Sequence, residues 1–167
     1  NDVPILTEIG DQQTDEDIDF IIDISASDVD MATNDQTLTF SVESSDSSLV
    51  VVTAETQGDG TAGTLTFDVQ SEQNGTAIIM VTVEDNGDTS LIDTNSFVLT
   101  VNAVNDAPIL TEIGNQSTDE DEDFSIDISA SDVDMATNDQ TLVFSAVSSD
   151  SSLVVVTAET QGDGTAG

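Results

Sequence analysis

Residues 18–25 read IDFIIDIS, and residues 122–129 read EDFSIDIS. The second stretch replaces Ile21 by Ser125 but keeps Phe20 and the two alternate isoleucines that follow it. In a β-strand successive side chains point to opposite faces, so one face tolerates polar residues while the other stays apolar. This pattern predicts a strand whose even-numbered side chains face a core and whose odd-numbered side chains face water.

The same alternation continues outward along the chain. Thr39 and Glu43 become valine in the second copy, whereas Leu38 and Phe40 are unchanged. Asp-Gly and Asn-Gly dipeptides, which are typical of tight turns, separate the later apolar runs. Helix signals are essentially missing, and we expect about seven strands per repeat, near residues 3–9, 18–25, 37–42, 49–54, 63–69, 75–83 and 95–101.

An internal repeat organises the chain. Residues 1–63 align with residues 105–167, and 55 of the 63 aligned positions are identical because 8 differ. The alignment predicts one complete repeat over residues 1–104 and a second, near-identical repeat over residues 105–167 that lacks counterparts of residues 64–104, roughly its last three strands. Either the second repeat is cropped, or another chain completes it. The fold class predicted is all-β: tandem seven-stranded Greek-key sandwiches of the immunoglobulin type.

The charge balance excludes several functions. The chain carries 35 Asp plus Glu and no Lys, Arg or His, which gives a formal net charge of -35. Without basic residues it has no surface for nucleic acid or for anionic membranes, and no apolar run is long enough for membrane insertion. Without His, Cys, Lys or Tyr it lacks the usual catalytic bases and nucleophiles, so we expect no enzyme. The chain does contain the carboxylate, amide and hydroxyl oxygens that cations such as Ca²⁺ use as ligands.

The acids gather between the predicted strands. Dense groups lie at residues 15–17, 28–30 and 84–85, and at Asn105 and Asp106 where the repeats join. For any single Asp, a solvated turn residue is the simpler interpretation. The spacing after Asp28 does not fit an EF-hand loop, because alanine and threonine occupy the positions of required ligands and of the glycine.

In order along the chain, these groups resemble the motifs of the cadherin repeat, particularly the cadherin-like tandem repeats of giant bacterial surface adhesins. Residues 14–17 take the place of the acidic motif after the first cadherin strand, and residues 28–30 that of D-A-D. Residues 71–73 match L-D-R-E only in part. Residues 83–87 fall on A-x-D-x-G, and residues 101–108 fall on the D-x-N-D-N-x-P linker.

The resemblance implies Ca²⁺ bound between neighbouring repeats. The ligands it implies are Glu16 and Glu72 from the first repeat, Asn102, Asn105 and Asp106 from the linker, and Asp132, Asp134 and the region of Asn138 from the second repeat. Asp28, Asp30 and Asp85 would serve a preceding linker in the same way. Cadherins have Asp where this chain has Asn102, and they have a second acid near residues 70–73, so the number of ions per linker stays open between two and three.

The function expected from these features is that of a calcium-rigidified structural extender in a secreted or cell-surface bacterial adhesin or filament. Its partners would be neighbouring repeats of the same chain and identical chains in a filament. A carbohydrate-binding module is one alternative, although such surfaces normally use exposed Trp or Tyr, and the six Phe here are expected in the core. A subunit completed by strand exchange with a neighbour is another. Halophilic adaptation would instead spread acids over all exposed faces.

Overall fold

The computed structural model describes residues 1–135, 140–162 and 164–166. Contacts divide the chain into two compact units, Asn1–Val104 and Asn105–Gly167, and each is described by itself. No helix among the described residues is long and apolar enough to span a membrane. The first unit contains β1 (Ile5–Leu6), β2 (Gln12–Asp15), β3 (Phe20–Ser27), α1 (Met31–Asn34), β4 (Leu38–Ser44), β5 (Val50–Gln57), β6 (Ala62–Val69), β7 (Gly75–Asp85) and β8 (Ile92–Asn102).

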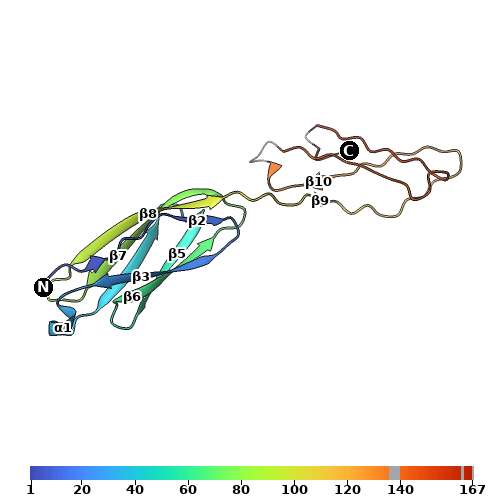
Figure 1. The fold of residues 1–167 in the computed structure, drawn as a ribbon. Coiled ribbons are helices and arrows are strands. Elements are labelled where there is room, and N and C mark those ends of the chain that lie inside the picture. Colours follow the sequence, from blue (N-terminus) through green and yellow to red (C-terminus); the bar gives the residue numbers. More distant parts are fainter. Residues whose placement is uncertain (136–139, 163, 167) are drawn as a thin grey trace. The chain divides into compact units, whose positions relative to one another are not determined.

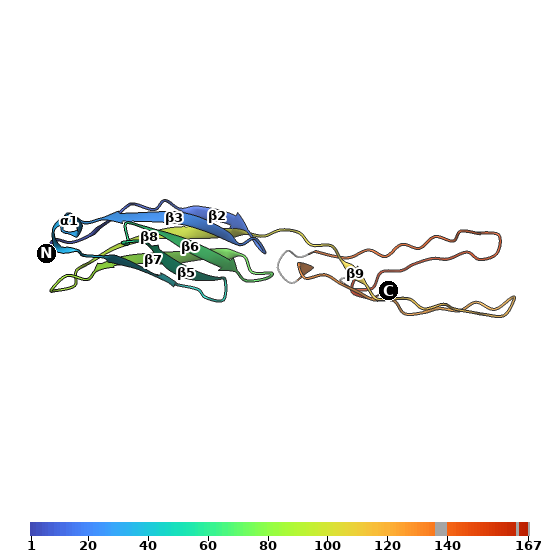
Figure 2. The ribbon, with the colours of Figure 1, turned by 90° about the horizontal axis from the view of Figure 1, so that it is seen from below.

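The strands of the first unit form two four-stranded sheets (Figures 1 and 2). One sheet has the order β1-β3-β6-β5 and the other the order β2-β8-β7-β4. All neighbouring strands are antiparallel except β2 and β8, which run parallel. This order corresponds to the two sheets of the immunoglobulin-type sandwich, so the predicted all-β Greek-key class is confirmed for this unit.

The predicted facing of the strands is also confirmed. Leu38 and Phe40 on β4 are buried, whereas the intervening Thr39 and Glu43 are exposed. On β3, Ile21 is 63% exposed, while Ile24 is buried. The changes at Ile21, Thr39 and Glu43 are therefore solvent-facing, which explains how these positions accept Ser or Val, whereas Val42, which is Ala146 in the second repeat, is half-buried and packs against the core.

Four phenylalanines belong to the core of this unit. Phe67 is completely buried, and its ring stacks on that of Phe20 with 4.3 Å between the centroids. The ring of Phe97 lies 6.3 Å from that of Phe67, and Phe40 belongs to the same cluster. The prediction that Phe side chains build the core is correct for these four, so none of them offers a flat exposed ring for sugar stacking. It is wrong for Phe124 in the second unit, which is 52% exposed.

The first predicted strand is wrong in part, because the chain changes sheets within it. The strand expected at residues 3–9 shrinks to β1, and an unpredicted β2 follows it in the opposite sheet. Side chains replace ladder hydrogen bonds nearby: the backbone N of Leu6 donates to Asp93 Oδ2 at 2.9 Å, and that of Val98 donates to Asp11 Oδ1 at 2.9 Å. The sequence of β2, QQTD, has no apolar residue, so alternation could not indicate it.

The second unit forms far fewer strands than its sequence predicts. Among its described residues only β9 (Ile109–Leu110) and β10 (Ala130–Ser131) are strands, and they pair antiparallel. In the first unit β6 pairs with both β3 and β5, and β7 pairs with both β4 and β8. The second unit has no counterparts of residues 64–104, so the segments equivalent to β3, β4 and β5 lose their hydrogen-bonding partners.

Candidate metal centre

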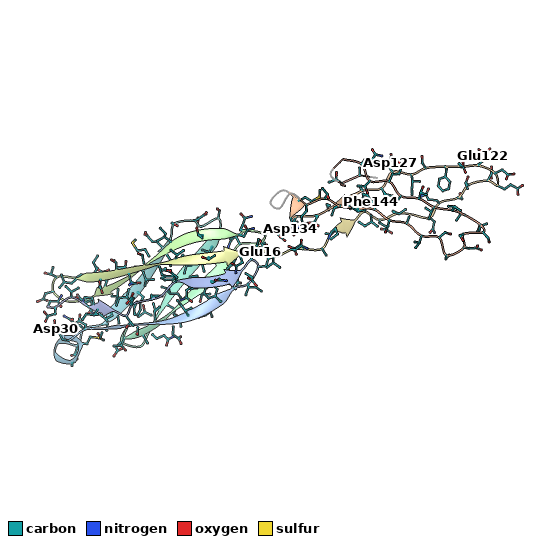
Figure 3. All side chains as sticks on the ribbon, turned by 45° about the horizontal axis from the view of Figure 1, so that its top comes forward. Glu16, Asp30, Glu122, Asp127, Asp134 and Phe144 are labelled. Atoms are coloured by element: carbon teal, nitrogen blue, oxygen red, sulfur yellow. The ribbon has the colours of Figure 1, made fainter. Side chains whose placement is uncertain are left out.

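One end of the first unit gathers Asp28, Asp30 and Asp85 around the start of the chain. Asp28 and Asp30 follow β3, where the backbone N of Asp30 donates to Asp28 Oδ1 at 2.8 Å and forms a tight Asx turn. Asp30 Oδ2 accepts a hydrogen bond from the backbone N of Asp2 at 2.6 Å. The N-terminus, α1 and Asp30 lie together at this end (Figures 2 and 3).

Asp85 is the last residue of β7 and is 2% exposed. Burial by itself raises the pKa of the Asp85 carboxyl. Hydrogen bonds from the backbone N of Gly87 at 3.0 Å, from Asn1 Nδ2 at 3.0 Å and from the backbone N of Leu91 at 3.2 Å outweigh burial. Together with the positive chain terminus, they hold the pKa below its ordinary value of 3.8. The carboxylate is therefore kept charged inside the end of the sandwich.

Replacing Asp85 by Asn should destabilise the first unit in a pH-dependent way. Because the pKa of Asp85 is lower in the folded state, its ionised form adds stability above the unfolded pKa of about 4, and this stability is lost as pH falls through the folded value. We expect D85N to lower the free energy of unfolding by about 1–3 kcal/mol near pH 7. Urea unfolding from pH 7 to pH 3, in chelator, measures this difference.

The matched control is Asp68→Asn, which removes one charge from an exposed side chain on β6. That variant should show no comparable loss, since relief of charge repulsion is common to both changes. A D85N penalty that stayed constant down to pH 3 would contradict the assigned role of the Asp85 charge.

The second unit builds the corresponding end in the same way. The backbone N of Asp134 donates to Asp132 Oδ1 at 2.9 Å, and Asp134 Oδ2 accepts from the backbone N of Asp106 at 2.6 Å. These contacts copy those of Asp28, Asp30 and Asp2 although most strands of the second unit are missing. The geometry is thus determined locally by the sequence. Asn138 lies outside the described residues.

The opposite end of the first unit is built around Glu16, which is 4% exposed (Figure 3). Glu16 follows β2, and its backbone N donates to the carbonyl oxygen of Asn102 at 2.9 Å. Its Oε1 accepts from the backbone N of Val104 at 2.5 Å, and its Oε2 accepts from Asn74 Nδ2 at 3.3 Å. The ends of β2 and β8, the β6–β7 loop and the segment that follows β8 therefore meet at one buried carboxylate.

Three more acids lie at this end: Asp15 and Asp17, which flank Glu16 in the sequence, and Glu72, which contacts Asp17. Asn102 Nδ2 donates to Asp15 Oδ1 at 3.0 Å, and the backbone N of Glu72 donates to Asp17 Oδ1 at 3.1 Å. Asp17 and Glu72 have φ values of 62° and 58°, in the left-handed region that is unfavourable for residues other than glycine. This end of the unit holds strained backbone and several carboxylates with no cationic side chain in the chain to balance them.

Other acids have ordinary turn roles. Asp46 and Asp59 each accept a side-chain and a backbone hydrogen bond from the residue two positions on, Ser48 and Thr61. These hydrogen bonds lower the pKa of both carboxyls, and the bond from the hydroxyl has the largest effect. Asp150 and Ser152 repeat the arrangement in the second unit. The interpretation of a single Asp as a turn residue is therefore correct at these positions.

The donor set suits a hard divalent cation. Every side-chain ligand available at these ends is a carboxylate or amide oxygen, which Ca²⁺ prefers. Asp28 Oδ2 is buried and has no hydrogen-bond partner, and a bound cation or water would satisfy it. Among the described residues, no three carboxylates drawn from one unit alone bring their oxygens within 4.8 Å of one another. Each end taken singly offers only part of a coordination shell.

The sequence interpretation placed ligands at these ends but missed several participants. Asn1 is not among the predicted ligands, although it is the counterpart in the first repeat of Asn105, which is. Gln36 and Asn74 were also missed. Both are neutral residues outside the acidic groups, so only their hydrogen bonds to Asn1 and Glu16 identify them.

Comparison with known proteins gives only a structural likeness. No family model and no curated protein sequence matches the chain. The protocadherin gamma B4 extracellular domain is 19% identical with a TM-score of 0.48, covering 78% of this chain and 24% of its own. Extracellular cadherin domains 1–4 of protocadherin gamma B7 are 20% identical with a TM-score of 0.47, covering 66% and 28%.

A third similar structure is a nucleoside hydrolase-related hypothetical protein from Saccharophagus degradans that is associated with carbohydrate metabolism. It is 17% identical with a TM-score of 0.43, covering 61% of this chain and 26% of its own. The chain thus spans about a quarter of the length of each of these proteins. Similarity at this level carries no information about function.

Proposed function

We propose that this chain is a calcium-stiffened extender of an extracellular bacterial adhesin or surface filament, without catalytic activity. The observation that supports this most directly is the burial of acidic groups at the ends of the sandwich. Glu16 and Asp85 are almost inaccessible, and Asp28 Oδ2 has no partner, yet the chain contains no basic side chain. Ions from outside would balance the charge that hydrogen bonds alone leave in place, and extracellular fluids provide Ca²⁺ at millimolar concentration.

The division of the acids between two roles favours binding over simple halophilic acidity. Turn-forming acids such as Asp46 and Asp59 are exposed and satisfied by their own loop. The acids at the ends of the unit instead contact backbone groups from distant parts of the sequence, as Glu16 does with Val104. Only the latter group would be expected to change the structure when a cation binds.

Electrostatic repulsion explains how Ca²⁺ would stiffen a string of such units. Two unit charges 4 Å apart at an effective dielectric constant near 20 repel by about 4 kcal/mol. We propose that the end with Glu16 and Glu72 and the end with Asp132 and Asp134 share ions across the linker. A joint of carboxylates would be held open by repulsion without the ions and fixed by them when bound.

Small-angle X-ray scattering of the 167-residue chain tests this proposal. With Ca²⁺ we expect the profile of a stiff particle with a well-defined maximum dimension, and in chelator that of a flexible one. The variant Glu16→Gln with Asp134→Asn should lose the difference, whereas Glu55→Gln, on an exposed position of β5, should keep it. Identical profiles of the unmodified protein with and without Ca²⁺ would rule out the stiffening role.

A further inference from the structure

Gln36 is a buried side chain with one unsatisfied oxygen. It lies between α1 and β4 at the end of the first unit that holds Asp30, and it is 8% exposed. Its Nε2 donates to Asn1 Oδ1 at 2.5 Å. Its Oε1 is buried and has no hydrogen-bond partner. Buried polar atoms are nearly always paired, so this oxygen requires an explanation.

Its surroundings determine which atom of the Gln36 amide is the unpaired one. Asn1 Nδ2 donates both to Asp85 Oδ2 at 3.0 Å and to the carbonyl oxygen of Thr89 at 2.9 Å. Both of these atoms only accept hydrogen bonds, so the Asn1 amide cannot be turned around. Asn1 Oδ1 must then face Gln36, and Gln36 must present its nitrogen to it. The unpaired atom is therefore the oxygen.

The same pair is present in the second unit, where Gln140 Nε2 donates to Asn105 Oδ1 at 2.6 Å. In the first unit the turn at Gly87 closes over the pair. A Cβ at Gly87 would come within 2.3 Å of Asn1 Oδ1 and 2.8 Å of Gln36 Nε2, so a larger residue here would have to displace the two amides. The pair of amides is thus repeated with the sequence, and in the first unit the turn at Gly87 packs against it.

We propose that Gln36, and Gln140 in the second unit, belong to the cation sites at these ends. In this role Nε2 holds the Asn side chain so that a lone pair of its Oδ1 stays available, and Oε1 is itself a neutral ligand. The cation is a hard divalent ion such as Ca²⁺, bound at the same end as Asp28, Asp30 and Asp85. This inference rests on the calcium binding of the proposed function and adds a residue that the acidic motifs do not contain.

A neutral ligand has a physical advantage at this end. Asp28, Asp30 and Asp85 already place three acids at this end, and a fourth would add to the negative charge there when no ion is bound. An amide oxygen adds a ligand without additional charge. Since the affinity for Ca²⁺ depends on the number of charged ligands and on the rigidity of the site, Gln36 would keep binding in the range of extracellular modules.

The test uses the 167-residue chain with Gln36→Met and Gln140→Met, which keep the length of the side chain but remove the oxygen and the donor. Calorimetric titration with CaCl₂ should show an affinity lower by roughly 10–100-fold, the usual loss when a group that supports metal ligands is removed. In chelator, the thermal unfolding midpoint of the double variant should change little, because removal of an unpaired buried oxygen offsets the loss of the hydrogen bonds from Nε2 to the two Asn side chains.

A purely structural role would give the opposite pattern, a lower midpoint in chelator with unchanged calcium affinity, and that result would overturn the inference. As a second variant, Gln36→Glu with Gln140→Glu restores a ligand oxygen and should bind Ca²⁺ more tightly than the Met variant. Gln57→Met, at an exposed position at the end of β5, serves as the control. If Asp30→Asn with Asp134→Asn weakens binding and the Met variant does not, this inference fails while the proposed function stands. If the unmodified protein binds no Ca²⁺, both fail.

Discussion

Addition of Ca²⁺ to the chelator-treated protein is expected to raise the thermal unfolding midpoint of the first unit by roughly 10–20 °C. A ligand that binds only the folded state at 100 times its dissociation constant stabilises that state by about 2.7 kcal/mol. For a domain of about 100 residues, each kcal/mol corresponds to roughly 4–8 °C. Differential scanning calorimetry in Ca²⁺ and in chelator measures the shift directly.

Specific binding must be distinguished from screening of the charge of -35. Screening depends on ionic strength alone, so NaCl at matched ionic strength should then reproduce the effect of CaCl₂. Specific coordination predicts a much larger shift with CaCl₂, and loss of most of that shift in Glu16→Gln. An increase of only one or two degrees, or an equal increase with NaCl, would contradict the calcium proposal.

The sequence predicted the sandwich of the first unit well because apolar and polar residues alternate along the strands that build its core. On β3 and β4 the period of two, tested by the natural differences at Ile21 and Thr39, identified the buried face correctly. It could not reveal β2, whose four residues are all polar and pair with β8 in a parallel ladder. Nor could it show that β1 and β2 belong to different sheets, since the change of sheet depends on side chains of β8 such as Asp93.

The candidate site was predictable in location but not in detail. Acidic groups between strands suggested the ends of the sandwich, and Glu16 and Asp85 are indeed buried there. The composition gives no way to separate these from Asp59, which only stabilises its own turn. Gln36 could not be found from charge at all, because its role follows from a hydrogen bond to a residue 35 positions away.

The second large effect concerns the second unit, whose apolar side chains are exposed although their sequence is that of a core. Leu49 is 4% exposed in the first unit, but its counterpart Leu153 is 84% exposed. Val50 is fully buried, whereas Val154 is 50% exposed. Since the local sequence is the same, the difference comes from residues 64–104, which form most of β6 and all of β7 and β8 in the first unit and have no counterpart in the second.

We therefore expect that a chain extended beyond Gly167 by the sequence of residues 64–104 folds its second unit into the same two sheets. Full burial of a Leu or Val side chain contributes about 1.5–3 kcal/mol, and several such side chains would be covered at once. Hydrogen exchange should show strong protection of the amides around Leu153 in the extended chain and little in the 167-residue chain. Unfolding should become more cooperative, with a larger calorimetric enthalpy.

The control for this experiment is an extension in which the counterparts of Ile79, Val81 and Val83 are serine. These three inward side chains of β7 are fully buried in the first unit, so the control has the same length but cannot form the core. Equal protection with both extensions, or none with either, would contradict the explanation. Adding residues 64–104 as a separate polypeptide tests strand exchange. Protection of the Leu153 amide would show that the segment binds without a covalent link to the second unit. Its backbone edges and its apolar face would then be sufficient for binding.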